Sequence, residues 1–319
     1  MGLGAARADP PAPPPLRALR WIAAGVDADR VLTSRPVECL AVPADPEAAW
    51  LVEVGRAVFR SPLLLGGRAA RAGVACETCH RGGRTNPDFH FPGLSGAPGT
   101  ADVTSFVFSS HRGDHVDDPR PIPDLGGPKA ALKVSQSPDS PALRTFIRGL
   151  VVEEFDGAAP PAAVLDGLAA YVRALDPAAC GAGAWAPVTA DDALADVRRA
   201  VVAAQGALAR HDAATALVMI QAARARLGDV AERYAGPALA SERHGLERSS
   251  LDLGAIEDQI RRAQPGTGER LALWLTRGRP LRAALVRLEG RSLYDRGRLA
   301  AALVARSALV EPASTSSGR

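Results

Sequence analysis

The 319-residue sequence has few aromatic side chains, no long apolar run and little net charge. Aromatic residues make up only 4% of the chain, so Ala, Leu and Val must fill the interior. Such an interior suits closely packed helices and leaves room for another bulky apolar group, such as a cofactor. No run approaches the roughly 18 apolar residues of a membrane-spanning helix, which predicts no integral membrane segment. The net charge of +3 is too small to indicate a nucleic-acid partner, and we predict none.

Residues 1–44 are predicted to be a flexible N-terminal segment. A Pro- and Ala-rich stretch opens the chain, and a short apolar patch follows at 21–26. This segment contains neither the apolar region nor the small-residue cleavage site of a secretory signal. No export signal is therefore visible in the sequence.

Hydrophobic periodicity predicts an all-α fold of two domains. In the first domain, residues 45–180, helices are expected over 45–59, 141–153 and 160–176, with a long loop insertion over 61–141. A linker at 181–189 leads to an α-helical bundle at 190–310 and a disordered tail at 311–319. We expect the bundle to fold on its own, because its apolar pattern is self-sufficient.

Local signals place the ends of the bundle helices. Thr189 and Asp192 resemble a capping box in which Asp replaces Glu. Helix breaks are expected at five glycines: Gly228, Gly236, Gly266, Gly278 and Gly290.

The run Cys76-Glu77-Thr78-Cys79-His80 has the C-x-x-C-H spacing by which c-type haem is attached. Two thiols one helical turn apart can bond to the two vinyl groups on one edge of the porphyrin. The adjacent imidazole then lies under the iron as the proximal ligand. The motif predicts one covalent haem c, held by Cys76 and Cys79 and ligated by His80.

Two other readings of the same cysteines remain open. His111 and His115 form a second pair with zinc-ligand spacing, although more residues separate it from the cysteine pair than in a classical finger. A thioredoxin-like dithiol has the same C-x-x-C spacing, but no strand–helix–strand pattern surrounds it here.

The helices on either side of the motif add a family resemblance. Gly55-x3-Phe59 precedes the motif, and Tyr171 lies on the last helix of the domain. This arrangement resembles the cytochrome c family, whose first and last helices cross at a glycine and an aromatic ring. The segments 54–62, 74–81, 86–90 and 153–157 resemble, more narrowly, the N-terminal domain of the di-haem cytochrome c peroxidases. Those enzymes carry two haem motifs and this chain has one, so their activity does not carry over.

The second axial ligand of the iron is predicted to be histidine. Met1 and Met219 are the only methionines, and Met219 lies in an apolar stretch typical of a core. His90 follows the motif between two phenylalanines and is the favoured ligand. His111 and His115 are the alternatives in the same loop.

Cys39 and Cys180 bracket the haem domain and are predicted to form a disulfide. Haem c attachment and a disulfide both belong to an oxidising compartment, which predicts a periplasmic or otherwise exported protein. A cluster of arginines over 277–298 is either a solvated helix face or a docking site for an acidic partner.

Together these features predict a mono-haem c-type cytochrome that exchanges single electrons with a redox partner protein. The first alternative is a peroxidase-like haem enzyme related to the di-haem family. The second is a non-redox scaffold that haem or a metal organises.

Overall fold

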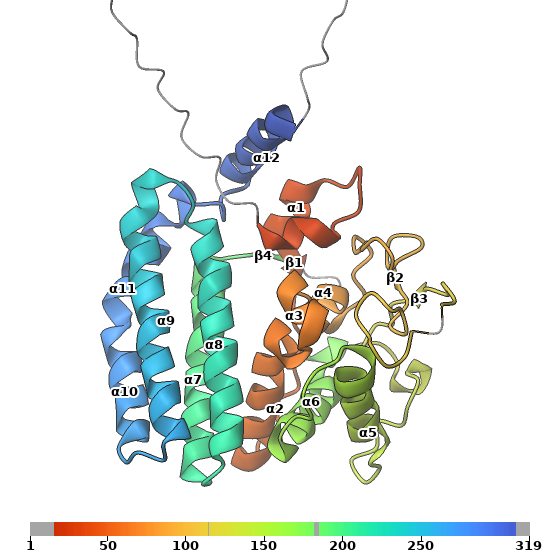
Figure 1. Cartoon of the computed structure of the whole chain (residues 1–319), viewed down its shortest axis with the longest axis horizontal. Coiled ribbons are helices and arrows are strands. Elements are labelled where there is room, and N and C mark those ends of the chain that lie inside the picture. Colours follow the sequence, from red (N-terminus) through yellow and green to blue (C-terminus); the bar gives the residue numbers. More distant parts are fainter. Residues whose placement is uncertain (1–15, 114, 182–184, 311–319) are drawn as a thin grey trace, which may run out of the picture.

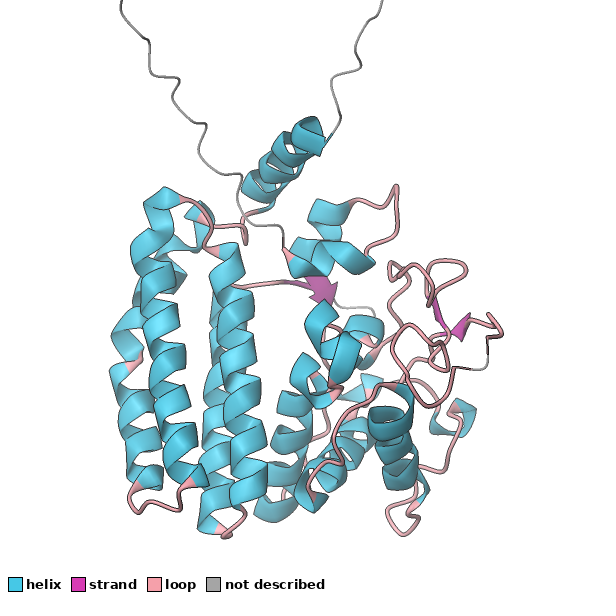
Figure 2. Ribbon diagram, in the orientation of Figure 1, coloured by secondary structure: helices cyan, strands magenta, loops and turns pink. Residues whose placement is uncertain are grey.

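The computed structural model describes residues 16–113, 115–181 and 185–310. The chain is mostly helical, with loops concentrated on one side of the molecule (Figure 2), and the prediction of a mainly helical chain is confirmed. Two short antiparallel ribbons accompany the helices. One pairs β1 (Ser34–Pro36) with β4 (Trp185–Pro187), and the other pairs β2 (Thr100–Ala101) with β3 (Arg120–Pro121). Within the described residues, no helix combines the length and apolar character needed to cross a membrane.

The first predicted helix is α2, which extends from Pro46 to Phe59. Pro46 occupies its first turn, where no backbone N–H is needed, and the Asp45 carboxylate accepts a hydrogen bond from the Ala48 N–H at 2.8 Å. The helix ends before Pro62, as expected. Three shorter helices follow it: α3 (Gly67–Ala72), α4 (Cys76–Cys79) and α5 (Ala142–Gly149), which continues into the π-helical turn η5 (Leu150–Glu154).

Helix α6 (Ala162–Ala174) packs across α2. The residue opposite Gly55 is Gly167, not the predicted aromatic ring: a Cβ on Gly55 would overlap the Gly167 carbonyl. The ring of Tyr171 lies one turn further along, with its centroid 4.9 Å from that of Phe59. Two facing glycines let the helix backbones touch, and the two rings fill the space beside them.

Residues 16–44 correct the prediction of a flexible N-terminal segment, which covered residues 1–44. They form the 3-10 turn η1 (Arg17–Trp21), helix α1 (Ala28–Thr33) and strand β1. Trp21 is buried, and its carbonyl accepts a hydrogen bond from the His90 N–H at 3.1 Å. The short apolar patch at the end of the segment therefore anchors it. Residues 1–15 lie outside the described part.

In the C-terminal part, α7 to α11 run side by side, while α12 lies apart from them near α1 (Figure 1). Their bounds are α7 (Ala190–Ala209), α8 (Ala213–Arg233), α9 (Ala240–Arg261), α10 (Thr267–Arg277), α11 (Arg279–Leu288) and α12 (Arg296–Val310). The Thr189 hydroxyl accepts a hydrogen bond from the Asp192 N–H at 3.0 Å, as expected of a cap. The predicted tail at 311–319 lies outside the described residues.

Four of the five predicted glycine breaks coincide with helix ends, and one is wrong. Gly228 lies inside α8, because one glycine in a helix costs only about 1 kcal/mol, which tertiary packing outweighs. A break that the glycines did not signal separates α7 from α8. There Asp212 starts the new helix by accepting a hydrogen bond from the Thr215 N–H at 2.9 Å.

The largest apolar core extends across the predicted domain boundary. It includes Val58 and Leu168 from the first part and Val201 and Ile220 from the second. Helix α2 contacts both α7 and α8, and the Trp50 indole N–H donates to the Ala203 carbonyl at 3.1 Å. The two parts therefore share a hydrophobic core, whereas the apolar periodicity of the sequence predicts that the second part folds on its own.

Candidate functional site

The C-x-x-C-H motif is a single fixed turn. Its cysteines begin and end α4, and the His80 N–H donates to the Cys76 carbonyl at 2.8 Å. Asn86 holds the turn from outside: its side chain donates to the Thr78 carbonyl at 2.9 Å, and its backbone N–H donates to the Cys79 carbonyl at 3.1 Å. Hydrogen bonds between residues close together in the chain therefore set the relative positions of the two cysteines and the histidine.

The His80 ring is held by a carbonyl far away in the sequence. Its Nδ1 lies 3.0 Å from the Pro123 carbonyl oxygen, which can only accept, so Nδ1 carries the proton and donates. Burial lowers the pKa of His80 to about 4, against the opposing effect of this hydrogen bond, and the ring is neutral at neutral pH. The lone pair on Nε2 is then available to a metal. This tautomer and orientation are typical of metal-bound histidine in proteins.

The two thiols are neutral and lie against an apolar cluster. Cys76 and Cys79 are free, and both pack on a group of buried side chains that is rich in phenylalanine: Trp21, Leu65, Val74, Phe89, Leu94, Phe108, Ile122, Val151 and Phe155. Burial raises the pKa of each thiol to about 12. A reactive dithiol needs a lowered thiol pKa, so this environment disfavours the thioredoxin-like reading.

The segment that carries Pro123 is fastened on both sides. The Thr85 hydroxyl donates to the Ile122 carbonyl at 2.9 Å, and the Arg84 guanidinium pairs with Asp124 at 2.8 Å. Further along, the Lys129 ammonium donates to three carbonyls, those of Leu125, Val172 and Leu175, at 2.8 to 3.0 Å. Sequence reasoning missed both Pro123 and Lys129, because their role depends on contacts with distant segments.

Two glycines directly after the motif let it approach its neighbours closely. Gly82 and Gly83 both have positive φ, 61° and 76°, which glycine adopts without strain. A Cβ on Gly82 would lie 2.8 Å from the Pro36 carbonyl oxygen, and one on Gly83 would overlap the Leu175 side chain. The turn that directly follows His80 is therefore brought against β1 and the end of α6.

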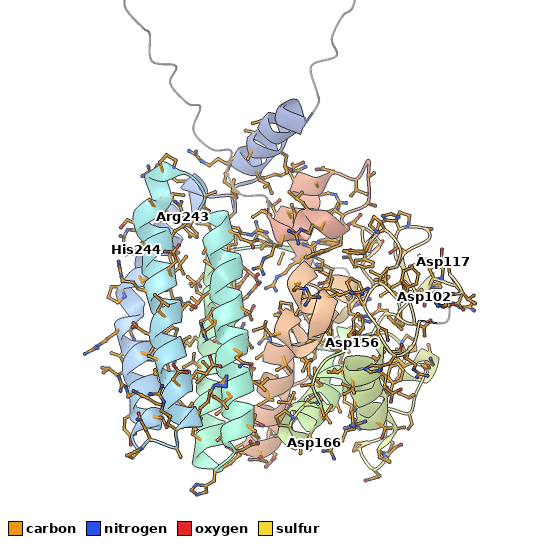
Figure 3. The ribbon with its side chains drawn as sticks, viewed as in Figure 1. Asp102, Asp117, Asp156, Asp166, Arg243 and His244 are labelled. Atoms are coloured by element: carbon orange, nitrogen blue, oxygen red, sulfur yellow. A yellow bond between two sulfur atoms is a disulfide. The ribbon has the colours of Figure 1, made fainter. Side chains whose placement is uncertain are left out.

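The other candidate histidines lie elsewhere. His111 is 63% exposed and its Nε2 is 3.7 Å from the carboxylate of Asp156, which lies at the edge of the loop segment (Figure 3). The His115 ring stacks on Phe106 with a centroid separation of 5.9 Å. His90 is half-buried. Among the described contacts, no hydrogen bond or ring contact joins any of the three to His80, so the second axial ligand stays a prediction.

The zinc reading requires the cysteine pair and the histidine pair to converge. The thiols instead lie on the phenylalanine-rich cluster, while His111 and His115 make the separate contacts just described. In the described part of the chain, no three His, Cys, Asp or Glu side chains come together in a way that would hold a metal ion. The structure does not assemble the four-ligand zinc site.

The disulfide between Cys39 and Cys180 is confirmed, with their Cα atoms 5.4 Å apart. Backbone hydrogen bonds accompany it: the Asp176 N–H donates to the Cys39 carbonyl at 3.0 Å, and the Ala41 N–H donates to the Ala174 carbonyl at 2.8 Å. The bridge therefore links the chain before α2 to the chain after α6.

A buried ion network that the sequence did not reveal lies beside the helix crossing. Glu38 accepts hydrogen bonds from the Tyr171 hydroxyl and from Arg60, both at 2.6 Å. Burial acts to raise the pKa of Glu38, but the charges of Arg60 and Arg56 outweigh it and the pKa falls to about 2. Arg60 also lies 3.7 Å from Asp196 on α7, so the network continues into the C-terminal part.

Searches against protein-family models, characterised proteins and solved structures found no match for this chain. The functional argument therefore depends on the residues around His80. Two neutral thiols on one turn, a neutral imidazole with a free Nε2 and an apolar surface rich in phenylalanine fit a covalently attached haem. Met219 belongs to the large core on α8 and is fully buried there, as its apolar surroundings in the sequence predict.

Proposed function

We propose that this protein is a mono-haem c-type cytochrome that transfers single electrons. The observation that carries the proposal is the hydrogen bond from His80 Nδ1 to the Pro123 carbonyl, within a C-x-x-C-H turn whose thiols are both free. A carbonyl acceptor on one ring nitrogen directs the other nitrogen towards a metal and raises its basicity. A chance C-x-x-C-H sequence gives no reason for a distant carbonyl to hold the histidine in this way.

When bound, the haem iron would accept one electron and pass it on, without a change in its covalent attachment. The residues of the chain hold it for that purpose. Cys76 and Cys79 would form the two thioether bonds, and His80 would be the proximal ligand. The adjoining cluster around Phe89, Phe108 and Phe155 excludes water, which favours electron transfer with little solvent rearrangement.

A cytochrome c-like fold for residues 45–180 is part of the proposal. The close crossing of α2 and α6 at Gly55 and Gly167, with the Phe59 and Tyr171 rings beside it, supports this resemblance. The Phe59 ring also lies 6.4 Å from the His80 ring, which places the crossing next to the proposed haem. We also propose that the α-helices that follow residue 190 form a bundle attached to the haem domain, as their apolar periodicity predicts.

Electron transfer is preferred to peroxidase chemistry because the chain has one haem motif. The di-haem peroxidases that it resembles use one haem to supply electrons to another. We propose His90 as the second axial ligand, which would close the iron to peroxide. A labile or absent second ligand would favour the peroxidase-like alternative instead.

We propose that the protein is exported and acts with a redox partner protein outside the cytoplasm. The Cys39–Cys180 disulfide supports this location, because disulfides persist in oxidising compartments. Haem c attachment requires the same kind of compartment.

The decisive experiment is expression of the full chain with a cytochrome c maturation system, followed by denaturing electrophoresis and optical spectroscopy. We expect haem to remain on the denatured chain and to give low-spin, reversibly reducible bands. The double variant Cys76→Ala/Cys79→Ala should lose it. The matched control Cys39→Ser/Cys180→Ser, which also removes two cysteines, should keep it. High-spin ferric haem would favour the peroxidase-like alternative, and a colourless wild-type protein would overturn the proposal.

A further inference from the structure

A cavity of about 220 Å³ lies between η1, α1, α4 and α8. It meets the motif turn at Ala75, Glu77 and Thr78, the residues around and between the cysteines, and not at Cys76, Cys79 or His80. Trp21 lines the cavity and also belongs to the cluster on which the thiols pack, but the thiols and the His80 ring do not line the cavity, and it is not the space proposed for haem.

Arginines dominate the charged lining of this cavity. Six arginines face it, against four carboxylates: Arg17, Arg35, Arg60, Arg81, Arg226 and Arg233 against Glu77, Asp192, Asp229 and Glu232. Behind the wall, Glu38, Glu53 and Asp196 are shared among Arg56, Arg60, Arg199 and Arg226. These three carboxylates meet only two arginines, Arg56 and Arg199, that are not already part of the lining, so the cavity and its surrounding ion pairs together keep an excess of one positive charge.

Two of the arginines have no carboxylate partner in the described part of the chain. Arg81 donates to the carbonyls of Val31 and Ser34, the latter at 2.6 Å, and its buried Nη1 has no hydrogen-bond partner among the described residues. Arg233 donates to the carbonyls of Leu32 and Leu293 at 2.7 and 2.9 Å. The backbone fixes both guanidinium groups without a direct contact to a carboxylate, although the charge of Glu77 acts on Arg81 and the Tyr294 ring centroid lies 4.7 Å from the Arg233 guanidinium.

A partly buried guanidinium that forms no ion pair is costly, because burial removes water that would otherwise solvate the charge. Burial lowers the pKa of Arg233, which shows the same cost. An anion in the cavity would recover this free energy through short, charge-assisted hydrogen bonds. The planar fork of arginine suits carboxylate and phosphate oxygens in particular.

We propose that this cavity binds a small oxyanion carrying one or two negative charges. Its ligand is a free phosphate or the carboxylate groups of a small organic acid, held by Arg81 and Arg233. The volume of the cavity is consistent with a ligand this small, because pockets for drug-sized ligands occupy roughly 300–1,000 Å³ and this cavity is smaller. Because Arg81 follows His80 directly, an anion bound here would lie just behind the motif turn.

Isothermal titration calorimetry of the full chain at constant low ionic strength tests the proposal, with inorganic phosphate and succinate as separate probes. We expect at least one probe to bind at one site per chain. Arg233→Gln and Arg81→Gln should each weaken binding at least tenfold. The matched control Arg277→Gln, which removes the same charge from the exposed face of α10, should leave affinity within about twofold of wild type.

Asp192→Asn gives a test in the opposite direction. Asp192 lines the cavity and pairs with Arg35 at 3.5 Å, so its neutralisation should free an arginine and tighten binding several-fold. This variant tests the proposed anion site even if the arginine variants do not fold. Binding of phosphate alone or succinate alone identifies the source of the oxyanion. Absence of binding by both probes, or equal affinity in wild type and Asp192→Asn, would overturn the proposal. The heat of anion binding can be measured with or without haem. Failure of this proposal can therefore be distinguished from failure of the proposed cytochrome function.

Discussion

Lys129 and Leu175 join the loop segment to the end of α6: the Lys129 ammonium donates to the Leu175 carbonyl at 2.8 Å. The same ammonium group also binds the carbonyls of Leu125 and Val172. One side chain therefore supplies a hydrogen-bond donor to three backbone carbonyls. Lys129 lies six residues beyond Pro123 in the chain. Between strand β3 and Lys129, the chain is positioned by this contact together with those of Thr85 and Arg84, and not by regular secondary structure.

Replacement of Lys129 by Met should destabilise the protein by roughly 1–3 kcal/mol, because it leaves several polar groups without a donor. Urea unfolding followed by circular dichroism measures the change. Lys133, the only other lysine, is an exposed residue whose ammonium lies 5.6 Å from the Phe146 ring centroid, and Lys133→Met is the matched control. Equal stability of the two variants would contradict the role assigned to Lys129.

Gly55→Ala should lower stability by about 1–3 kcal/mol through overpacking, because its Cβ would overlap the Gly167 carbonyl. Gly149 on α5 provides the comparison, since a Cβ there meets nothing within 4 Å. Gly149→Ala should be neutral or stabilising by up to about 1 kcal/mol. Thermal unfolding of both variants measures the difference. A neutral Gly55→Ala would mean that α2 and α6 do not approach as described.

Glu38 should make the stability of the protein depend on pH under acidic conditions. Its pKa falls from 4.5 to about 2 on folding, so its contribution is present in full above about pH 4.5 and is lost as the pH falls towards 2. The shift corresponds to a contribution on the order of 3 kcal/mol. Urea titrations between pH 2 and 6 should show this loss in wild type and in Glu269→Gln, an exposed control, but a weaker dependence in Glu38→Gln. The same slope in all three would contradict the assignment.

The haem-loaded His90→Ala variant should become high-spin and gain peroxide reactivity, if His90 is the second axial ligand. His111→Ala and His115→Ala should retain the wild-type spectrum, since their rings contact Asp156 and Phe106. An unchanged spectrum in His90→Ala, with conversion in either control, would move the assignment to that histidine. A methionine-to-iron charge-transfer band in the wild type would overturn the choice of histidine altogether.

The full chain should unfold in one cooperative transition, because the largest core includes residues from both predicted domains. The unfolding transition measured by fluorescence of the four tryptophans, which include Trp50 on α2 and Trp274 on α10, should coincide with that measured by far-ultraviolet circular dichroism. The isolated fragment 190–310 should be less stable than the same segment in the full chain, because it exposes the faces of α7 and α8 that contact α2. Two separate transitions, or an equally stable fragment, would restore the expectation that the second part folds on its own.

Local sequence patterns were sufficient for the features that neighbouring residues define. Pro46 and Asp45 start α2, Thr189 starts α7, and the spacing of Cys76, Cys79 and His80 places them on one turn. In each case the hydrogen bond or steric limit acts within four residues, so periodicity and capping chemistry predict it. The pairing of Cys39 with Cys180 was also within reach, because only two cysteines remained once the motif was set aside.

Only the tertiary structure decided which distant groups meet. The acceptor for His80 is the Pro123 carbonyl. Because every residue has a backbone carbonyl, the sequence does not indicate which one will supply this oxygen. Gly167 faces Gly55 because of the relative rotation of two helices, which their separate patterns do not specify. Trp21 is buried by segments that follow it in the chain, and the charged residues that line the arginine-rich cavity come from elements spread between η1 and α8. Such contacts join residues that are far apart in the chain. Their free energy depends on packing and burial in the folded protein, which local sequence patterns do not specify.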